Sequence, residues 1–307
     1  SCGSCVYRCP FGALQDKSFI LDAIKMLRLS ERVYAIVAPA IAGQFAYAKP
    51  GQVISAIKAL GFYKVVEAAL GADMVAYAEA AELAEKGFLT SSCCPAFVSF
   101  VKKQFPELAD KVSSNMSPMA TIAKRIKELD PGAKTVFIGP CTAKKGEFQL
   151  PEVHKYVDCV LTFEELQALF DSRDLDVASM EESELHDASG FGRIFAHCGG
   201  LATAAAEALK EQGSDFDLKP VSCNGIEECK LALMKASRGR LDANFVEGMA
   251  CVGGCINGAG SLTHGDVNRT KVDAFSKKST LASITDSLRT ASDEFDKSVA
   301  GGAGARE

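Results

Sequence analysis

Four cysteines lie in three short segments that also carry glycine or proline. The segments are SSCCP at 91–95, PCTAKKGE at 140–147 and EGMACVGGC at 247–255, and the cysteines are Cys94, Cys141, Cys251 and Cys255. Thiolates are soft, anionic ligands that suit iron. These segments predict a four-thiolate metal site with reactive groups beside it, and this combination indicates a redox catalyst built on an iron–sulfur cluster.

A structural zinc site is the alternative for the four cysteines. Zinc ligands usually come as two close C-x2–4-C pairs, whereas Cys94 and Cys141 are isolated in this chain. Gly253 and Gly254 allow the backbone to approach a bulky cluster closely. The spacing therefore favours a cluster over a single zinc ion.

Composition limits the function to small-molecule chemistry. The 307 residues are 48% hydrophobic and 24% charged, and the net charge of −5 comes without any basic run. We therefore expect neither nucleic acid nor a membrane as a partner. No apolar stretch approaches the roughly 20 residues that span a bilayer, and no signal peptide is visible, so the expected location is the cytoplasm. There, 12 cysteines indicate metal ligation rather than disulfides.

The first residues form a second cysteine pattern. Cys2, Cys5 and Cys9, followed by Pro10, read C-x2-C-x3-C-P, the last three cysteines of a bacterial ferredoxin run. In that run Cys2 and Cys5 would bind one cluster and Cys9 another, so neither ligand set is complete. A chance group of cysteines is the alternative. We expect residues 1–14 to be a truncated ferredoxin-like segment of a longer protein with upstream clusters.

Strand and helix periods alternate along the rest of the chain. Strands are expected at 33–37, 63–69, 135–138 and 156–161 and ending near 246, and helices at 20–29, 50–60, 72–86, 163–170, 201–212 and 226–236. This order predicts an α/β fold in which two lobes of mostly parallel, twisted sheets are flanked by helices and bury the cluster site between them.

The expected organisation has one main domain between two short ends. Residues 15–270 form the domain that carries the cluster, and its two lobes divide near residue 130. Residues 271–307 form a C-terminal helical tail, helical at 276–289 and disordered at 301–307.

The three cysteine segments resemble, in order and spacing, the signature segments of the catalytic domain of FeFe-hydrogenases, over most of residues 30–270. The resemblance implies that Cys94, Cys141, Cys251 and Cys255 bind a 4Fe-4S cluster. Cys255 would also bridge to a two-iron subcluster that carries CO, cyanide and an azadithiolate. The implied reaction is the reversible oxidation of H2 to protons and electrons.

The resemblance also implies partners. Electrons would pass to further 4Fe-4S clusters at the N-terminus of the full-length protein, or to a ferredoxin-like donor or acceptor. Dedicated hydrogenase maturation proteins would install the two-iron subcluster, which can be absent without them.

Cys93 is left free because Cys94 takes the ligand position. The resemblance implies that Cys93 passes protons to the amine of the dithiolate, supplied along Glu82, Glu79, Ser113 and water. Glu79 and Glu82 lie three apart on one helix face, and Ser113 follows Cys93 by 20 residues, where the family's serine stands. The alternatives are a structural cysteine and an ordinary solvated helix face.

Further residues are assigned to the two-iron pocket by resemblance. Lys144 would donate to a cyanide ligand and Glu147 would pair with Lys144, although a surface charge run is the alternative. The residues expected to line the pocket are Met249, Pro39, Ala38, Ser117, Pro118, Phe195 and Ala196.

Several positions depart from the family pattern. Gly139 replaces a methionine, Ala40 a serine, Met119 a glutamine and Phe97 a tryptophan. Loss of the serine hydroxyl removes a hydrogen bond of about 0.5–1.5 kcal/mol, and Gly139 is expected to open space that water could fill. These changes indicate a divergent, sensory-type hydrogenase.

Three functions are compatible with this pattern. They are a hydrogenase, a hydrogen or redox sensor that uses the same site, and a non-catalytic hydrogenase-like protein of iron–sulfur assembly. Cys93, Lys144, Glu147 and Met249 favour the enzyme, because a scaffold needs neither a proton donor nor a cyanide anchor. No role is assigned to five other residues, of which His197 and Cys198 could line the pocket; the five are Cys159, His197, Cys198, Cys223 and Cys229.

Overall fold

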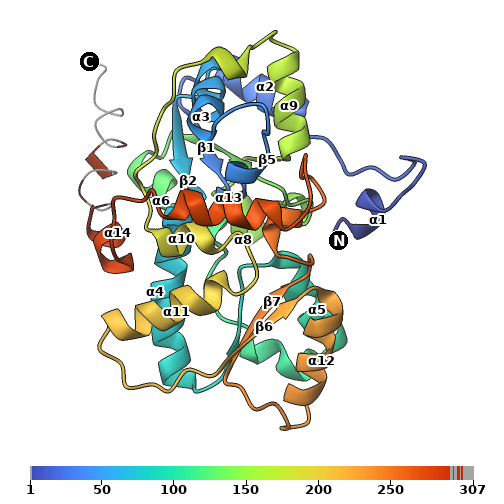
Figure 1. Cartoon of the computed structure of the whole chain (residues 1–307), viewed down its shortest axis with the longest axis vertical. Coiled ribbons are helices and arrows are strands. Elements are labelled where there is room, and N and C mark those ends of the chain that lie inside the picture. The colour runs from blue at the N-terminus through green and yellow to red at the C-terminus, as the bar shows by residue number, and fades with distance from the viewer. Residues whose placement is uncertain (1, 291–292, 294–295, 298, 300–307) are drawn as a thin grey trace.

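The chain forms two parallel sheets. In the computed structural model, which describes residues 2–290, 293, 296, 297 and 299, the first sheet has the order β2-β1-β4-β5 and the second the order β3-β7-β6. Every strand pair in both sheets is parallel. Figure 1 shows β1, β2 and β5 in the upper half of the molecule and β6 and β7 in the lower half. The predicted α/β class with parallel sheets flanked by helices is confirmed.

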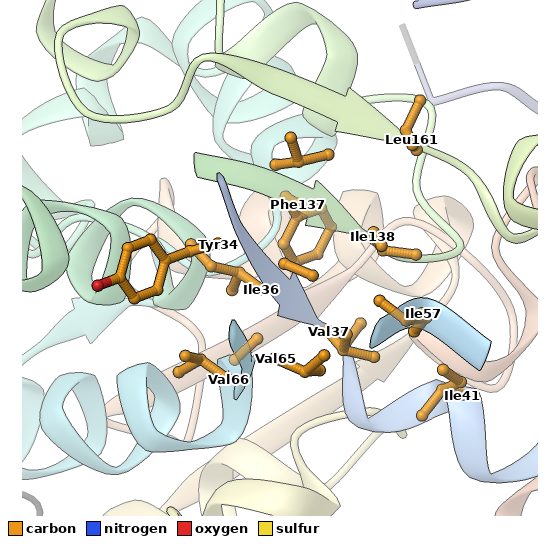
Figure 2. Close-up of a cluster of buried hydrophobic side chains, with 14 of the residues drawn as sticks. Tyr34, Ile36, Val37, Ile41, Ile57, Val65, Val66, Phe137, Ile138 and Leu161 are labelled. Atoms are coloured by element: carbon orange, nitrogen blue, oxygen red, sulfur yellow. The ribbon is translucent and has the colours of Figure 1, made fainter. Parts of the chain in front are cut away.

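The first sheet consists of β1 (Val33–Val37), β2 (Lys64–Glu67), β4 (Lys134–Ile138) and β5 (Cys159–Leu161). All five residues of β1 are buried, as expected for a central parallel strand covered on both faces. Figure 2 shows the side chains of β1 between those of β2 and β4. Its flanking helices are α2 (Ile20–Leu29), α3 (Pro50–Ala59), α6 (Pro118–Leu129) and α9 (Phe163–Asp171).

The second sheet is smaller and draws its strands from distant parts of the chain. It joins β3 (Leu89–Thr90) to β7 (Phe245–Met249) and β7 to β6 (Pro220–Asn224). α5 (Pro95–Gln104) and α12 (Ile226–Ala236) share an apolar cluster with it, built around Phe97, Leu233 and Val246.

One long helix joins the two sheets. α4 (Ala68–Lys86) starts directly after β2 and leads into β3, so it runs from the upper sheet to the lower one in Figure 1. It packs on α6, α10 (Gly190–Ile194), α11 (Gly200–Glu211) and α14 (Ile284–Thr290). Its alanine and glycine residues allow this close packing on several sides.

Short helices complete the described chain. They are α1 (Ser4–Tyr7), α7 (Lys144–Glu147), α8 (Pro151–His154), α13 (Val267–Ser276) and the 3-10 turns η1 (Pro39–Gly43), η2 (Pro106–Lys111), η3 (Val177–Ser179) and η4 (Cys255–Asn257). α13 packs against η1 and α10 and belongs to the body of the fold.

Several predicted boundaries were wrong. No cut near residue 130 separates the lobes, because β4 and β5 pair with β1, whereas β3 pairs with β7. β2 ends at Glu67 rather than 69, and α4 begins at once. The predicted helix at 276–289 is divided between α13 and α14, and α13 crosses the expected boundary at 270. Residues 301–307 lie outside the described residues.

No helix within the described part of the chain has both the length and the apolar character that a membrane span requires.

Gly71 sets the distance between α4 and α6. A Cβ at this position would lie 2.2 Å from the backbone oxygen of Pro118, the first residue of α6. We expect Gly71→Ala to push the helices apart and to lower the free energy of unfolding by about 1–3 kcal/mol, despite the better helix propensity of alanine. Urea denaturation followed by circular dichroism measures the change.

Gly146 provides the matched control. It is exposed in α7, and a Cβ there meets no atom within 4 Å. Gly146→Ala should leave stability unchanged or raise it slightly. Equal effects of the two substitutions would contradict the close-approach argument.

Candidate functional site

The ends of four strands meet at one buried cavity. Pro39 follows β1, Cys141 follows β4, Cys93 and Cys94 follow β3, and Met249 ends β7, and all of them line this cavity. Parallel strands place ligands beyond their carboxyl ends, and here two sheets do so at the same place. The arrangement explains how segments far apart in sequence form one site.

Three of the predicted ligands line the cavity itself. They are Cys94 at the N-cap of α5, Cys141 after the Gly139-Pro140 turn, and Cys255 at the start of η4. Burial raises the pKa of the Cys141 thiol to about 11 and also raises the pKa of Cys255. Metal binding to these thiols must therefore release protons.

Cys251 belongs to the same loop as Cys255 but is not among the residues that line the cavity. It lines a neighbouring groove together with Cys2. Burial, followed by the charges of Cys141, Cys255 and Cys94, raises its pKa, so the four sulfurs lie within electrostatic reach of one another.

The donor set fits an iron–sulfur cluster better than a single ion. Zinc requires ligands that converge to about 2.3 Å from one point. In the described part of the chain, no group of three or more His, Cys, Asp or Glu side chains does so. Four soft thiols spread around a cavity match a polynuclear cluster, whose iron atoms are ligated separately.

Glycine allows the ligand loop to pack tightly. Gly253 and Gly254 have φ values of 84° and 91°, and a Cβ on Gly254 would lie 2.7 Å from the backbone nitrogen of Cys198. His197 and Cys198 therefore support the loop from behind. They are not among the residues that line the cluster cavity, and His197 Nε2 pairs with Asp273 at 2.9 Å.

The half-buried Cys93 lies near the fully buried Glu79. Burial, and next the charge of Glu79, raise the pKa of Cys93. Both carboxylate oxygens of Glu79 are buried without a hydrogen-bond partner among the described residues. Burial raises the pKa of Glu79 to about 8, although the nearby Ser113 hydroxyl and Ser92 backbone amide oppose the rise. An unsatisfied buried carboxyl is rare and calls for a functional explanation.

Glu82 connects this pair to the surface. It accepts hydrogen bonds from the Ser113 hydroxyl at 2.8 Å, from Asn115 Nδ2 at 2.9 Å and from Lys86 Nζ at 2.6 Å. Burial alone would raise its pKa, but the hydrogen bonds from Lys86, Ser114 and Ser113 outweigh burial and lower it. The lowered pKa of Glu82 favours its anionic form, whereas the raised pKa of Glu79 favours its neutral form.

The structure alters the predicted order of these groups. Ser113 was expected between Glu79 and Cys93, but its hydroxyl donates to Glu82 and lies close to Glu79. The geometric sequence is therefore Glu82, Ser113, Glu79 and Cys93. Sequence could not give this order, because it depends on which way each side chain turns.

Lys144 is buried and lines the cavity. Its Nζ donates to Glu147 at 2.7 Å and to the backbone oxygen of Cys93 at 3.4 Å, so one N–H remains for an occupant. Burial lowers the pKa of Lys144, but the charges of Glu147 and Cys141 outweigh burial and raise it. The surface-run alternative does not fit, because the Lys144 and Glu147 side chains are each only 9% exposed.

The remaining wall is apolar. Most of the residues predicted for the pocket line this cavity, namely Ala38, Pro39, Pro118, Phe195, Ala196 and Met249. Ser117 does not. Its hydroxyl caps α6 by accepting from the backbone of Ala120.

The departures at Gly139 and Phe97 have structural explanations. The expectation that Gly139 opens space for water was wrong, because the Phe137 ring occupies that space. A Cβ on Gly139 would lie 2.7 Å from Phe137 Cε1, and Phe137 lines the cavity. Phe97 is fully buried, and its ring lies against Gly248.

Several site residues were missed in the sequence. Lys86 stands four residues after Glu82, a spacing that could have indicated the ion pair. Ser92 Oγ and Thr142 Oγ1, each beside a cavity cysteine in sequence, are buried without a hydrogen-bond partner among the described residues. Nothing in the sequence indicated that Phe137 belongs to the site, because phenylalanine is an ordinary core residue in a buried strand.

The unassigned thiols are mostly core residues. Cys159, Cys223 and Cys229 are buried, and the sulfur of Cys229 donates to the backbone oxygen of Met249 at 3.6 Å.

The N-terminal segment lies against the ligand loop. Tyr7 stacks on His264 at 4.2 Å, and Gly3 packs closely against Thr142. Further along, Lys145 joins the segment to the body by pairing with Asp16 at 2.6 Å and Glu165 at 2.7 Å.

Two parallel sheets bring three thiols to one cavity, with Cys251 in the adjoining groove, and this arrangement defines a candidate iron–sulfur centre. Residues 31–259 match the family described as "Iron only hydrogenase large subunit, C-terminal domain". The chain belongs to this family.

Individual relatives agree with this assignment. The chain is 30% identical over 321 residues to Iron hydrogenase 1 of Clostridium pasteurianum, covering 86% of this chain and 56% of that protein. It thus spans little more than half of that relative. A shorter match, 35% identical over 94 residues, covers 31% of this chain and 20% of the cytosolic Fe-S cluster assembly factor NAR1 of Kluyveromyces lactis.

A solved structure shows the same fold. A variant of apo FeFe-hydrogenase HydA1 from Chlamydomonas reinhardtii superposes with a TM-score of 0.73 at 20% sequence identity. The superposition covers 91% of this chain and 95% of that one.

Burial of Glu79 makes stability depend on pH. Its folded pKa of about 8 lies above the ordinary value of 4.5. The associated stability is present below pH 4.5 and is lost as pH rises towards 8. Glu79→Gln should remove this loss, so its stability relative to wild type should rise between pH 5 and 8.5 by on the order of 2–4 kcal/mol.

Urea denaturation of both proteins across this pH range tests the expectation. Glu85→Gln, at an exposed position of the same helix, is the control and should follow the wild type. If Glu79→Gln keeps the wild-type pH dependence, Glu79 is not a raised-pKa group.

Proposed function

We propose that the chain is the catalytic domain of an FeFe-hydrogenase, which interconverts H2 with protons and electrons. The observation that carries the proposal is the buried carboxyl of Glu79, which has no hydrogen-bond partner among the described residues, beside the half-buried Cys93 at a cavity that three candidate cluster ligands also line. A structural cluster needs a thiolate cage but no chain of acids leading to it.

Cys94, Cys141, Cys251 and Cys255 would hold a 4Fe-4S cluster, and Cys255 would also bridge to the two-iron subcluster. The bound group supplies the redox chemistry and the binding of H2. The third N–H of Lys144 would donate to a cyanide ligand, while Glu147 keeps the ammonium oriented at 2.7 Å. The apolar wall, including Pro39, Phe195 and Met249, would exclude water.

Proton transfer is the task of this chain's own acids. Lys86 and Asn115 hold Glu82 near the surface, and the Ser113 hydroxyl donates to it at 2.8 Å. A proton would pass through Ser113 to Glu79 and from Glu79 to the Cys93 sulfur. A carboxyl with a pKa of about 8 can both hold and release a proton near neutrality.

Electrons would enter or leave by way of Cys251. It shares a groove with Cys2, and the N-terminal segment lies against this face. We propose upstream 4Fe-4S clusters or a ferredoxin-like protein as the electron partner, maturation proteins as the source of the two-iron unit, and a cytoplasmic location. The substituted positions Gly139, Ala40 and Met119 favour a sensory-type member of low turnover.

Iron–sulfur assembly without hydrogen chemistry is the second candidate. The match to the NAR1 assembly factor favours it, although that match covers only 31% of this chain. A protein with this function would hold the 4Fe-4S cluster alone. The two candidates therefore differ in whether the protein accepts a two-iron unit.

Infrared spectroscopy after reconstitution with a synthetic two-iron precursor separates the two candidates. A hydrogenase should show bands of bound CO and cyanide. Their absence in a protein that carries its 4Fe-4S cluster would contradict the enzyme and favour assembly.

Cys93→Ala tests the proton route. The infrared bands should stay nearly unchanged, whereas H2 turnover should fall by about 100-fold or more, because general acid–base transfer is lost. Cys159→Ala removes another buried thiol, on β5 and away from the cavity, and should retain turnover. Undiminished turnover in Cys93→Ala would exclude Cys93 as the proton carrier.

A further inference from the structure

A second hollow lies behind the wall of the cluster cavity. This groove has a volume of about 460 Å³ and lies between α3 and α13. Its apolar surface includes Ile41, Phe45, Ile54 and Phe275. The volume falls in the range of small-molecule sites, which combine apolar walls with a few polar groups.

The groove and the cluster cavity share two segments. In η1, Pro39 and Ala40 line the cluster cavity, while Ile41 lines the groove. In α10, Gly192 lines the cavity and Arg193 the groove. An occupant of the groove would therefore contact the same two segments that form the wall of the cavity.

The charges of the groove are unbalanced. Lys49 pairs with Glu182 at 2.5 Å, and His186 lies 3.1 Å from Glu184. Lys271 and Lys278, on the α13 side, have no ion pair within the described part of the chain. An excess of cations in a chain with a net charge of −5 indicates an anionic occupant.

Arg193 adds a fixed donor at the groove. It is 1% exposed, and a bidentate pair with Glu67 at 2.7 Å and 2.7 Å holds it in place. Its Nη1 donates to the Phe275 backbone oxygen at 3.1 Å and retains a second N–H. The guanidinium also stacks over the Phe275 ring, with 4.1 Å from Cζ to the ring centroid.

We propose that this groove binds a small organic anion, a carboxylate or phosphate monoester on an apolar body. The body would lie on Ile41, Phe45 and Phe275, and the anionic head would bind Lys271 and Lys278. This proposal concerns binding alone and is independent of hydrogenase activity.

Titration of the purified protein with 8-anilino-1-naphthalenesulfonate, a fluorescent aromatic anion, tests the site. We expect saturable binding of one dye per chain. The uncharged parent, N-phenyl-1-naphthylamine, should bind at least about tenfold more weakly, because it lacks the head group. Equal affinity for the two dyes would overturn the proposal.

Amino-acid substitutions test whether the dye binds in the groove. Lys271→Gln with Lys278→Gln should weaken binding about tenfold, whereas Lys277→Gln, exposed on the same side of the fold but not lining the groove, should not. Ala46→Trp fills an exposed edge of the groove and should abolish binding. Ala206→Trp, exposed on α11, is its control. Binding that survives both groove variants would overturn the proposal.

Competition identifies the head group. Displacement of the dye by octanoate indicates a carboxylate ligand, and displacement by octyl phosphate indicates a phosphate monoester. Failure of both to displace it would overturn the assignment. Circular dichroism of each variant verifies that the fold is intact.

Discussion

The site depends on one geometric constraint, which is that two separate parallel sheets end their strands at the same point. α4 enforces this by running from β2 to β3 while packing on both α6 and α11. Because Gly71 brings α4 within contact of the α6 backbone, the cavity wall at Pro118 is fixed relative to the first sheet. The candidate ligands that follow the strands of both sheets are thus held in place by this framework.

Buried charge is distributed unevenly in this framework. Glu67 is paired with Arg193, Lys144 with Glu147, and Glu247 accepts from two backbone amides and Ser222. Each of these groups has partners that compensate for lost hydration. The Glu79 carboxylate is as deeply buried, but neither of its oxygens has a hydrogen-bond partner within the part of the chain that the structure describes. Burial raises the pKa of Glu79 to about 8, whereas the hydrogen bonds of the paired groups tie them to the framework.

Many helices and strands of this fold could be predicted from the sequence, because each depends on the hydrophobic period and end signals of its own segment. The buried run at β1, the proline-initiated α3 and the capped α9 all follow their periodicity and end signals. The motifs also predicted which cysteines lie near one another, and Cys94, Cys141 and Cys255 do line one cavity. The pairing of β3 could not be predicted, because a strand of two residues is too short to show an alternation of apolar and polar residues. The order of Ser113 and Glu79 and the filling of the Gly139 site by Phe137 depend on side-chain orientation across distant segments, which no local pattern encodes.

The pairing of β3 with β7 also determines when the second sheet can form during translation. The first sheet can form once Leu161 has been made, but Thr90 must wait for Val246, its partner in the register. Translation of the intervening chain takes on the order of 10 s or more. During that time β3 has only its bridge from Thr90 to Val112 and lacks β7, and Cys251 and Cys255 do not yet exist. A cluster held by all four cysteines could therefore be loaded only late, into a nearly finished chain, and the nascent chain would have to keep its first thiols reduced until the last ones arrive.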